Sequence, residues 1–313
     1  MNFKLEYYEI NGKKQCIGII GGRNDLPILF YLHGGPGETA IPLIMEYNKN
    51  LVDYFTVIVW EQRGSGMSFY EFDHDVTIST FVEDAIILIK KILSDYEKNN
   101  LILVGHSWGS VLGLNLITLR PDLVSFYIGI GQVVNMKDSS RIGYECVKSK
   151  AIQNNESLEL EKICKIDPEY TASTWHDDLN FINKLIVKYG GSIYGASTTN
   201  EYFKIFMSSS IYDLNELLKR QNGIKQSYEA LWHELMLINF EKRVNFKVPV
   251  AFIEGINDFH VSSHLAVKYF DSIETRKKLF LFNKSAHYPH WSEPNNFLRV
   301  CLKLLKEFSG IEF

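Results

Sequence analysis

The sequence predicts an α/β protein: a mostly parallel sheet of eight strands flanked by helices, with one helical segment inserted late in the chain. Two observations lead to this class. Short apolar runs alternate with helical patterns along most of the 313 residues, as expected for a parallel sheet covered by helices. Between about residues 135 and 246 this alternation stops, and charged and aromatic residues recur at helical spacing instead.

The sheet is expected to begin with an antiparallel hairpin. In the first twenty residues, FKLEYYEI and KQCIGII flank Asn11-Gly12, a pair that favours a tight two-residue turn. Six later runs are apolar enough to form strands that are buried on both faces. These runs are residues 27–32, 55–60, 101–104, 126–130, 249–255 and 278–282.

Helices are expected to fill the gaps between these strands. The clearest begins near Thr80, which forms a capping-box pattern with Glu83 ahead of apolar residues at helical spacing. Residues 135–246 are interpreted as a mostly helical insertion, in which YGGSIYGASTTN at 189–200 is the most loop-like part. The predicted core therefore consists of residues 1–134 and 247–313.

Composition excludes several classes of protein. The chain is 46% hydrophobic and 22% charged, which is ordinary for a globular protein, and its net charge of -4 offers no basic excess for nucleic acid. No stretch looks membrane-spanning, and the start lacks the layout of a signal peptide, so a cytoplasmic location is expected. The four cysteines are too scattered to suggest a disulfide framework or a zinc site. They are Cys16, Cys146, Cys164 and Cys301.

A candidate nucleophile follows the strand at 101–104. There the chain reads Gly105-His106-Ser107-Trp108-Gly109 and continues as a helix. Gly-x-Ser-x-Gly between a buried strand and a helix matches the nucleophile elbow, in which a strained turn exposes the serine hydroxyl. The two glycines suit a turn where strand and helix backbones crowd together.

The residues that such a serine needs occur in the expected order. A serine hydroxyl requires a histidine base, an acid that orients the base, and donors for the oxyanion. Asp258 follows the strand at 249–255, and His287 follows the strand at 278–282. Ser107, Asp258 and His287 thus each lie just past the carboxyl end of a predicted strand, where open α/β sheets place their sites.

The oxyanion donors are expected from two backbone segments. One is the N–H of Trp108, directly after the nucleophile. The other lies in HGGPG at 33–37, which follows the strand at 27–32 and whose glycines let the backbone approach a substrate oxygen. Gly35 is the candidate donor, and Gly34 is a candidate contact to the substrate.

Four motifs together resemble the α/β-hydrolase fold, and within it the proline iminopeptidase-like branch. They are HGGPG at 33–37, EQRGSGMS at 61–68, GHSWGS at 105–110 and GIND at 255–258. The resemblance implies Ser107 as nucleophile, Asp258 as acid, His287 as base, and Gly35 and Trp108 as the oxyanion hole. It also implies that the insertion is a lid after the sixth strand, and that no cofactor is needed.

The same resemblance implies a short peptide with a free amino terminus as substrate. Acidic residues of the cap and of the loop after the catalytic acid bind the amine in this branch, whereas here Phe259 follows Asp258. Because burying an ammonium group without a carboxylate is costly, a cap glutamate should point inward, and Glu201 and Glu234 are the candidates. Phe259 instead favours an apolar pocket and a carboxylesterase, so both substrate classes stay open.

Several other histidines, Arg63 and other functions also need an interpretation. His290 could compete with His287 as the base, but the SAH sequence just past the strand favours His287. His260 and His264 are spaced like a metal pair but lack a third ligand, so surface positions at a helix start are expected. Arg63 is interpreted as structural. An aspartate-nucleophile hydrolase conflicts with Ser107, and a non-catalytic ligand-binding protein on the same fold remains a third alternative.

Overall fold

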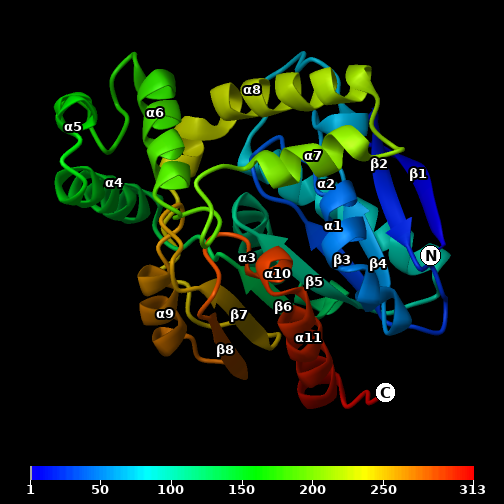
Figure 1. Cartoon of the computed structure of the whole chain (residues 1–313). Helices are drawn as coiled ribbons and strands as arrows, with labels where there is room; N and C mark the ends of the chain where they lie inside the picture. Colours follow the sequence, from blue (N-terminus) through cyan, green and yellow to red (C-terminus); the bar gives the residue numbers. More distant parts are fainter. Residues whose placement is uncertain (1) are drawn as a thin grey trace.

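The computed structural model of the protein describes residues 2–313 and contains one eight-stranded sheet (Figure 1). The strands are β1 (Phe3–Ile10), β2 (Lys13–Ile20), β3 (Ile28–Leu32), β4 (Thr56–Trp60), β5 (Leu101–His106), β6 (Val124–Ile130), β7 (Val250–Gly255) and β8 (Lys277–Phe282). Their order is β1-β2-β4-β3-β5-β6-β7-β8, with β3 to β8 parallel and the β1–β2 hairpin antiparallel. The predicted α/β class, the eight strands and the hairpin are confirmed.

Two details of the predicted elements were wrong. Strand β8 is not buried on both faces, because it is the edge strand and most of its side chains are partly exposed. Helix α2 (Ile78–Asp95) begins earlier than expected, because Thr77 is its N-cap. In this capping box the side-chain oxygen of Thr77 accepts from the backbone N–H of Thr80, and that of Thr80 accepts from the backbone N–H of Thr77. Thr80 is therefore the third residue of the helix rather than its cap.

Helices cover both faces of the sheet. Residues of α2, α3 (Trp108–Leu119) and α9 (Ser263–Ser272) contribute to the apolar core on one face. Residues of α1 (Ile41–Tyr47) and α11 (Pro294–Ser309) contribute to the core on the other, next to the short α10 (Pro289–Ser292). The parallel strands other than β8 are buried on both sides for this reason.

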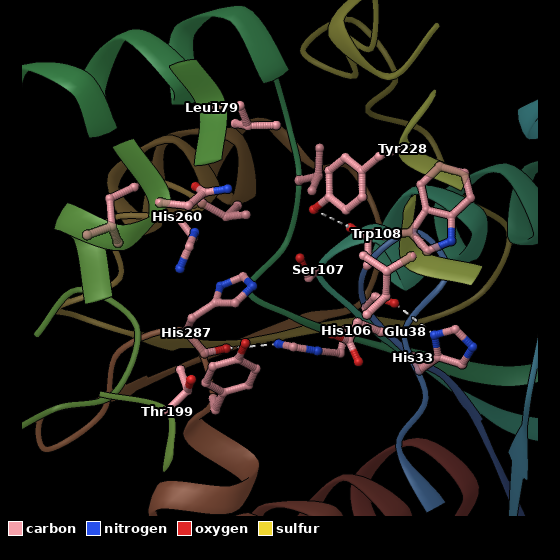
Figure 2. Close-up of a pocket in the computed structure, with 18 of the residues that line it drawn as sticks. His33, Glu38, His106, Ser107, Trp108, Leu179, Thr199, Tyr228, His260 and His287 are labelled. Carbon is pink, nitrogen blue, oxygen red and sulfur yellow. Dashed lines mark hydrogen bonds between the residues drawn. The ribbon is translucent and has the colours of Figure 1, made fainter. Parts of the chain in front are cut away.

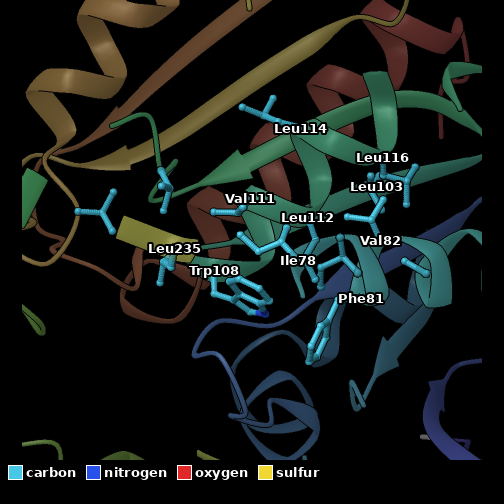
Figure 3. Close-up of a cluster of buried hydrophobic side chains, with 14 of the residues drawn as sticks. Ile78, Phe81, Val82, Leu103, Trp108, Val111, Leu112, Leu114, Leu116 and Leu235 are labelled. Carbon is cyan, nitrogen blue, oxygen red and sulfur yellow. The ribbon is translucent and has the colours of Figure 1, made fainter. Parts of the chain in front are cut away.

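The core around α2 and α3 fixes the turn that carries Ser107 (Figure 3). Trp108 is fully buried there, and its ring packs edge-on against Phe81 of α2 with centroids 5.6 Å apart. Its indole N–H donates to Gln62 Oε1 at 2.8 Å. A large aromatic side chain with a satisfied polar atom is a strong anchor for the adjoining backbone.

Five helices lie between β6 and β7: α4 (Met136–Gln153), α5 (Ser157–Ile163), α6 (Trp175–Lys188), α7 (Asn200–Ser208) and α8 (Leu214–Met236). In Figure 1 they lie together on the side of the sheet away from α11 and the C-terminus. Leu231 and Leu235 of α8 belong to the same core as α2 and α3, so α8 packs directly on the sheet domain. None of the helices described is both long and apolar enough to cross a bilayer.

Candidate active site

Ser107 lies in a strained turn between β5 and α3. Its backbone angles are φ 52° and ψ -119°, a conformation that costs a non-glycine residue energy and that clusters at functional sites. A Cβ added to Gly105 would approach the carbonyl oxygen of Gly109 to 2.5 Å, and one on Gly109 would collide with the carbonyl of Leu32. The two flanking glycines are therefore required sterically, as their positions in the sequence predicted.

Asp258 and His287 form a buried hydrogen-bonded pair. Asp258 Oδ2 accepts a hydrogen bond from His287 Nδ1 at 2.7 Å, and both side chains are buried. The loop after β7 carries the acid and the loop after β8 carries the histidine, which places both at the carboxyl edge of the sheet. In Figure 2 the His287 ring points toward Ser107.

Burial disfavours charge on both members of this pair. It lowers the pKa of His287 below the usual 6.5, because the imidazolium would lose its hydration. It also raises the pKa of Asp258, although the backbone N–H groups of Val261 and His260 oppose this by donating to Oδ1. A neutral imidazole held through Nδ1 leaves Nε2 free to accept a proton.

Two backbone segments lie beside Ser107. Trp108 is the first residue of α3, and the first N–H groups of a helix have no intrahelical acceptor. A Cβ on Gly34 would lie 3.3 Å from the Cβ of Ser107, so the loop after β3 touches the turn. Gly35 follows with φ +122°, a conformation suited to glycine. The structure thus brings Gly34 and Trp108 to Ser107, with Gly35 next along the loop.

A cavity of about 500 Å³ opens above Ser107 (Figure 2). Ser107, His287, Gly34, Gly35 and Trp108 all line it. Its walls come from α4, α6, α7 and α8 and are largely aromatic and aliphatic. They include Met136, Leu179, Ile186, Tyr202, Phe206, Tyr228 and Trp232.

The two glutamates expected to face the substrate do not line this cavity. Glu201 is exposed on the first turn of α7. Glu234 accepts from the backbone N–H of Ile78 at 2.8 Å, where a carboxylate stabilises the N-terminus of α2. Glu38, directly after HGGPG, is the one carboxylate among the described residues that line the cavity, and Arg220 Nη2 donates to its two oxygens at 2.8 and 2.6 Å.

The segment between α6 and α7 lies against the loops of the acid and the base. The backbone N–H of Phe259 donates to the carbonyl of Gly191 at 3.1 Å, and that of His287 donates to the carbonyl of Ser192 at 3.0 Å. A Cβ on Gly191 would come within 2.5 Å of the Phe259 ring, so the contact is close. Phe259 also lines the cavity.

His260 is not the surface residue that was expected. It precedes α9, lines the cavity, and its Nε2 is 2.5 Å from Ser192 Oγ. His264, by contrast, is exposed on α9. The spacing of four that suggested one helical face is misleading, because the helix starts only at Ser263. No group of three or more metal-ligating side chains is assembled within residues 2–313.

His290 and His106 lie close to the base but are bonded to other groups. His290 is fully buried, and its Nε2 is 2.8 Å from the hydroxyl of Tyr31. His106 Nε2 is 2.9 Å from the carbonyl oxygen of His287, with the two rings 4.8 Å apart. His106 therefore packs against the His287 ring and supports the backbone of His287.

Arg63 binds a buried carboxylate. Its Nε and Nη2 donate to the two oxygens of Asp84 at 2.7 and 2.8 Å, and both side chains are at most 1% exposed. Gln15 and Asn11 donate to the same carboxylate, and Arg63 Nη1 donates to Tyr70. The bonds join β2, α2 and the loop after β4, which is the structural role expected for Arg63.

Helix α8 is bonded to the loops that surround Ser107. The hydroxyl of Tyr228 donates to the carbonyl of Gly35 at 3.3 Å. Gln226 Nε2 donates to the carbonyls of Gly64 and Tyr70 at 3.2 and 2.9 Å. At Gly37 the backbones touch, because an added Cβ would collide with the carbonyl of Gly223.

The chain is similar to known proteins along most of its length. The family model described as "Serine aminopeptidase, S33" matches residues 51–198. The chain is 33% identical over 300 residues to a probable aminopeptidase, YbaC, of Bacillus subtilis, covering 94% of this chain and 93% of that protein. It is 21% identical to the proline iminopeptidase of Heyndrickxia coagulans, with coverage of 86% and 87%. A solved proline iminopeptidase from Mycobacterium smegmatis has the same fold, with a TM-score of 0.69, 15% identity and coverage of 97% and 98%.

Proposed function

Because the chain belongs to the serine aminopeptidase S33 family of α/β-hydrolases, we propose that it cleaves short peptides at a free amino terminus through an acyl-enzyme. One observation carries the proposal. Ser107 stands in a strained turn at the cavity that also contains His287, whose Nδ1 is held by the buried Asp258. Nucleophile, base and orienting acid in this relation form the arrangement of serine hydrolases.

The reaction would proceed in two halves. His287 Nε2 accepts the proton of Ser107 as Oγ attacks the substrate carbonyl, and then gives it to the departing amine. Water enters next and attacks the acyl group while His287 accepts one of its protons; His287 then returns that proton to Ser107 Oγ as the acid product leaves. Asp258 holds Nδ1–H throughout and thereby keeps the imidazole in the tautomer with a free Nε2.

The oxyanion formed in each half would be bound by the backbone N–H groups of Trp108 and Gly35. Fixed donors stabilise this charge without having to reorganise during the reaction. Each such donor contributes roughly a hundredfold or more in rate. The touching contact of Gly34 with Ser107 supports this assignment, because it holds the loop beside the nucleophile.

We further infer that residues 135–246 act as a lid. Four of the five helices in this segment contribute to the walls of the cavity, so they define the space above Ser107. A cavity of about 500 Å³ suits a small acyl group with a short leaving group. The lid would also exclude water while the acyl-enzyme forms.

The pH dependence of the reaction tests the role of His287. Only the neutral imidazole can accept a proton, and burial lowers its pKa below 6.5. We therefore expect kcat/KM for an uncharged ester to stay constant from pH 8 down to 6.5 and to fall only below that pH, as measured by stopped assays at constant ionic strength. An acid limb centred above 6.5 would contradict a buried imidazole base.

Recognition of the amine is tested at Glu38. An ammonium group bound in the cavity needs a carboxylate, and Glu38 is the one that the described lining offers. We expect Glu38→Gln to raise KM for a prolyl arylamide by roughly tenfold to a hundredfold, the range for a hydrogen bond to a charged group. Turnover of a short neutral ester should hardly change.

Arg220→Met supplies the matched comparison. It removes the partner of Glu38 and leaves the carboxylate available, so KM for the free amine should not rise. N-acetylated prolyl arylamide is the control substrate, and wild-type enzyme should strongly prefer the free amine. Equal turnover of the free and blocked compounds would contradict the aminopeptidase assignment.

A carboxylesterase is the second candidate function. Phe259 directly after Asp258 lines the cavity, and the walls around it are mostly aromatic and aliphatic. Glu38 is moreover already bound by Arg220, which neutralises its charge. Activity on a short-chain ester but not on the arylamide would select this function, with the same triad and the same mechanism.

A further inference from the structure

Four hydrogen bonds link Ser192, His260, Asp258 and His287 in a closed ring. Asp258 binds His287 Nδ1 through Oδ2 at 2.7 Å and accepts from the backbone N–H of His260 through Oδ1 at 2.8 Å. Ser192 Oγ is 2.5 Å from His260 Nε2. The carbonyl of Ser192 accepts from the backbone N–H of His287 at 3.0 Å, which completes the ring.

Ser192 belongs to the inserted segment, whereas its three partners belong to the sheet domain. It lies between α6 and α7 and is only 1% exposed, so water does not compete for its hydroxyl. Its two polar groups contact different loops: the hydroxyl binds the loop after β7, and the carbonyl binds the loop after β8. One residue of the insertion thus spans the loops of the acid and the base.

The ring restricts how Asp258 and His287 can move relative to each other. A shift of the loop after β7 would stretch the bond between His260 and Ser192, and a shift of the loop after β8 would stretch the bond to the Ser192 carbonyl. The His260 ring also lies beside the His287 ring, with centroids 5.1 Å apart, so it limits the rotation of the base. Catalysis is sensitive to misplacements of about 1 Å.

We propose that Ser192 and His260 are positioning residues that act through His287, so that the inserted segment sets the geometry of the base. This inference rests on the proposed function, in which His287 is the base. Neither residue needs to touch the substrate carbonyl to have this effect. The carbonyl of residue 192 would persist in any variant, so the side-chain hydroxyl is the part that substitution can test.

The test is a double-mutant cycle on full-length protein. Ser192→Ala and His260→Ala should each lower kcat for an activated ester by roughly tenfold to a hundredfold, with KM nearly constant. If both act through the one bond, the double variant should lose no more than the larger single loss. His260→Gln, which keeps a polar side-chain nitrogen, should restore part of kcat. Wild-type kcat in Ser192→Ala, or losses that multiply in the double variant, would overturn the proposal.

A second measurement needs no substrate. The proton shared by His287 Nδ1 and Asp258 gives a strongly deshielded NMR signal when the bond is fixed, and we expect Ser192→Ala to broaden it or shift it. An unchanged signal would overturn the positioning role even if activity fell. A changed signal in a protein without hydrolase activity would support positioning and reject the proposed function. Ser208→Ala is the control, because its exposed hydroxyl only bonds within α7.

Discussion

Replacing Ser107 by alanine is expected to abolish hydrolysis of activated esters and of prolyl arylamides. Loss of a triad nucleophile lowers kcat by roughly 10⁴-fold to 10⁶-fold, because only the oxyanion donors and substrate binding remain. The protein should stay folded, since the substitution removes a single oxygen at the cavity surface. Labelling by a fluorophosphonate probe should disappear with the activity, as read by mass spectrometry of the intact protein.

His287 and His290 form a matched pair for the same experiment. His287→Ala should inactivate the enzyme to a similar extent, whereas His290→Ala should retain turnover per folded molecule. His290 binds Tyr31 in the interior, so its loss affects stability rather than chemistry. Inactivation by His290→Ala in protein that remains folded, with activity kept in His287→Ala, would contradict the assignment of the base.

Asp84→Ala is expected to destabilise the protein by about 3–5 kcal/mol, the usual cost of leaving a buried charge without its partner. Arg63 would lose both bonds to the carboxylate while remaining at 1% exposure, and Gln15 and Asn11 would lose their acceptor. The free energy of unfolding can be measured by urea denaturation. An m-value equal to that of the wild type would indicate that unfolding remains two-state.

Asp73→Ala serves as the comparison for that measurement. Asp73 pairs with Lys13, but its side chain is 58% exposed, and surface ion pairs contribute only about 0–1 kcal/mol. If Asp84→Ala lowered the free energy of unfolding no more than Asp73→Ala does, the pairing of Arg63 with Asp84 would not stabilise the fold. The role of Arg63 in holding the loop after β4 would then have to be abandoned.

The positions of Ser107, Asp258 and His287 were predictable because each follows a strand. In a parallel sheet the carboxyl ends share one edge, so residues far apart in sequence meet without any knowledge of the helices. Strand β8 shows the limit of this reasoning. Its apolar run predicted a strand correctly. The run does not reveal, however, that this strand lies at the edge of the sheet, where most of its side chains are partly exposed.

The residues that sequence reasoning missed belong to the inserted segment and its contacts. Ser192 and His260 are 68 residues apart, and nothing local marks either one, because their bond depends on how the segment after α6 returns over the sheet. Glu38 could have been predicted to lie at the site, because it directly follows HGGPG, the loop expected beside the nucleophile. Neither Glu201 nor Glu234 lines the cavity, because their neighbours in the sequence do not show which face of α7 and α8 meets it.

The touching backbones of Gly37 and Gly223 bear on how the specificity of this enzyme could be redesigned. Helix α8 lies directly on the loop of the proposed oxyanion donor, and Tyr228 binds the carbonyl of Gly35 in that loop. A helix grafted from a relative in place of α8 would need a glycine at position 223 to come equally close. Exchange of α6 alone leaves this contact untouched, so α6 is the better place to engineer new substrates, provided that the segment with Ser192 after it is kept.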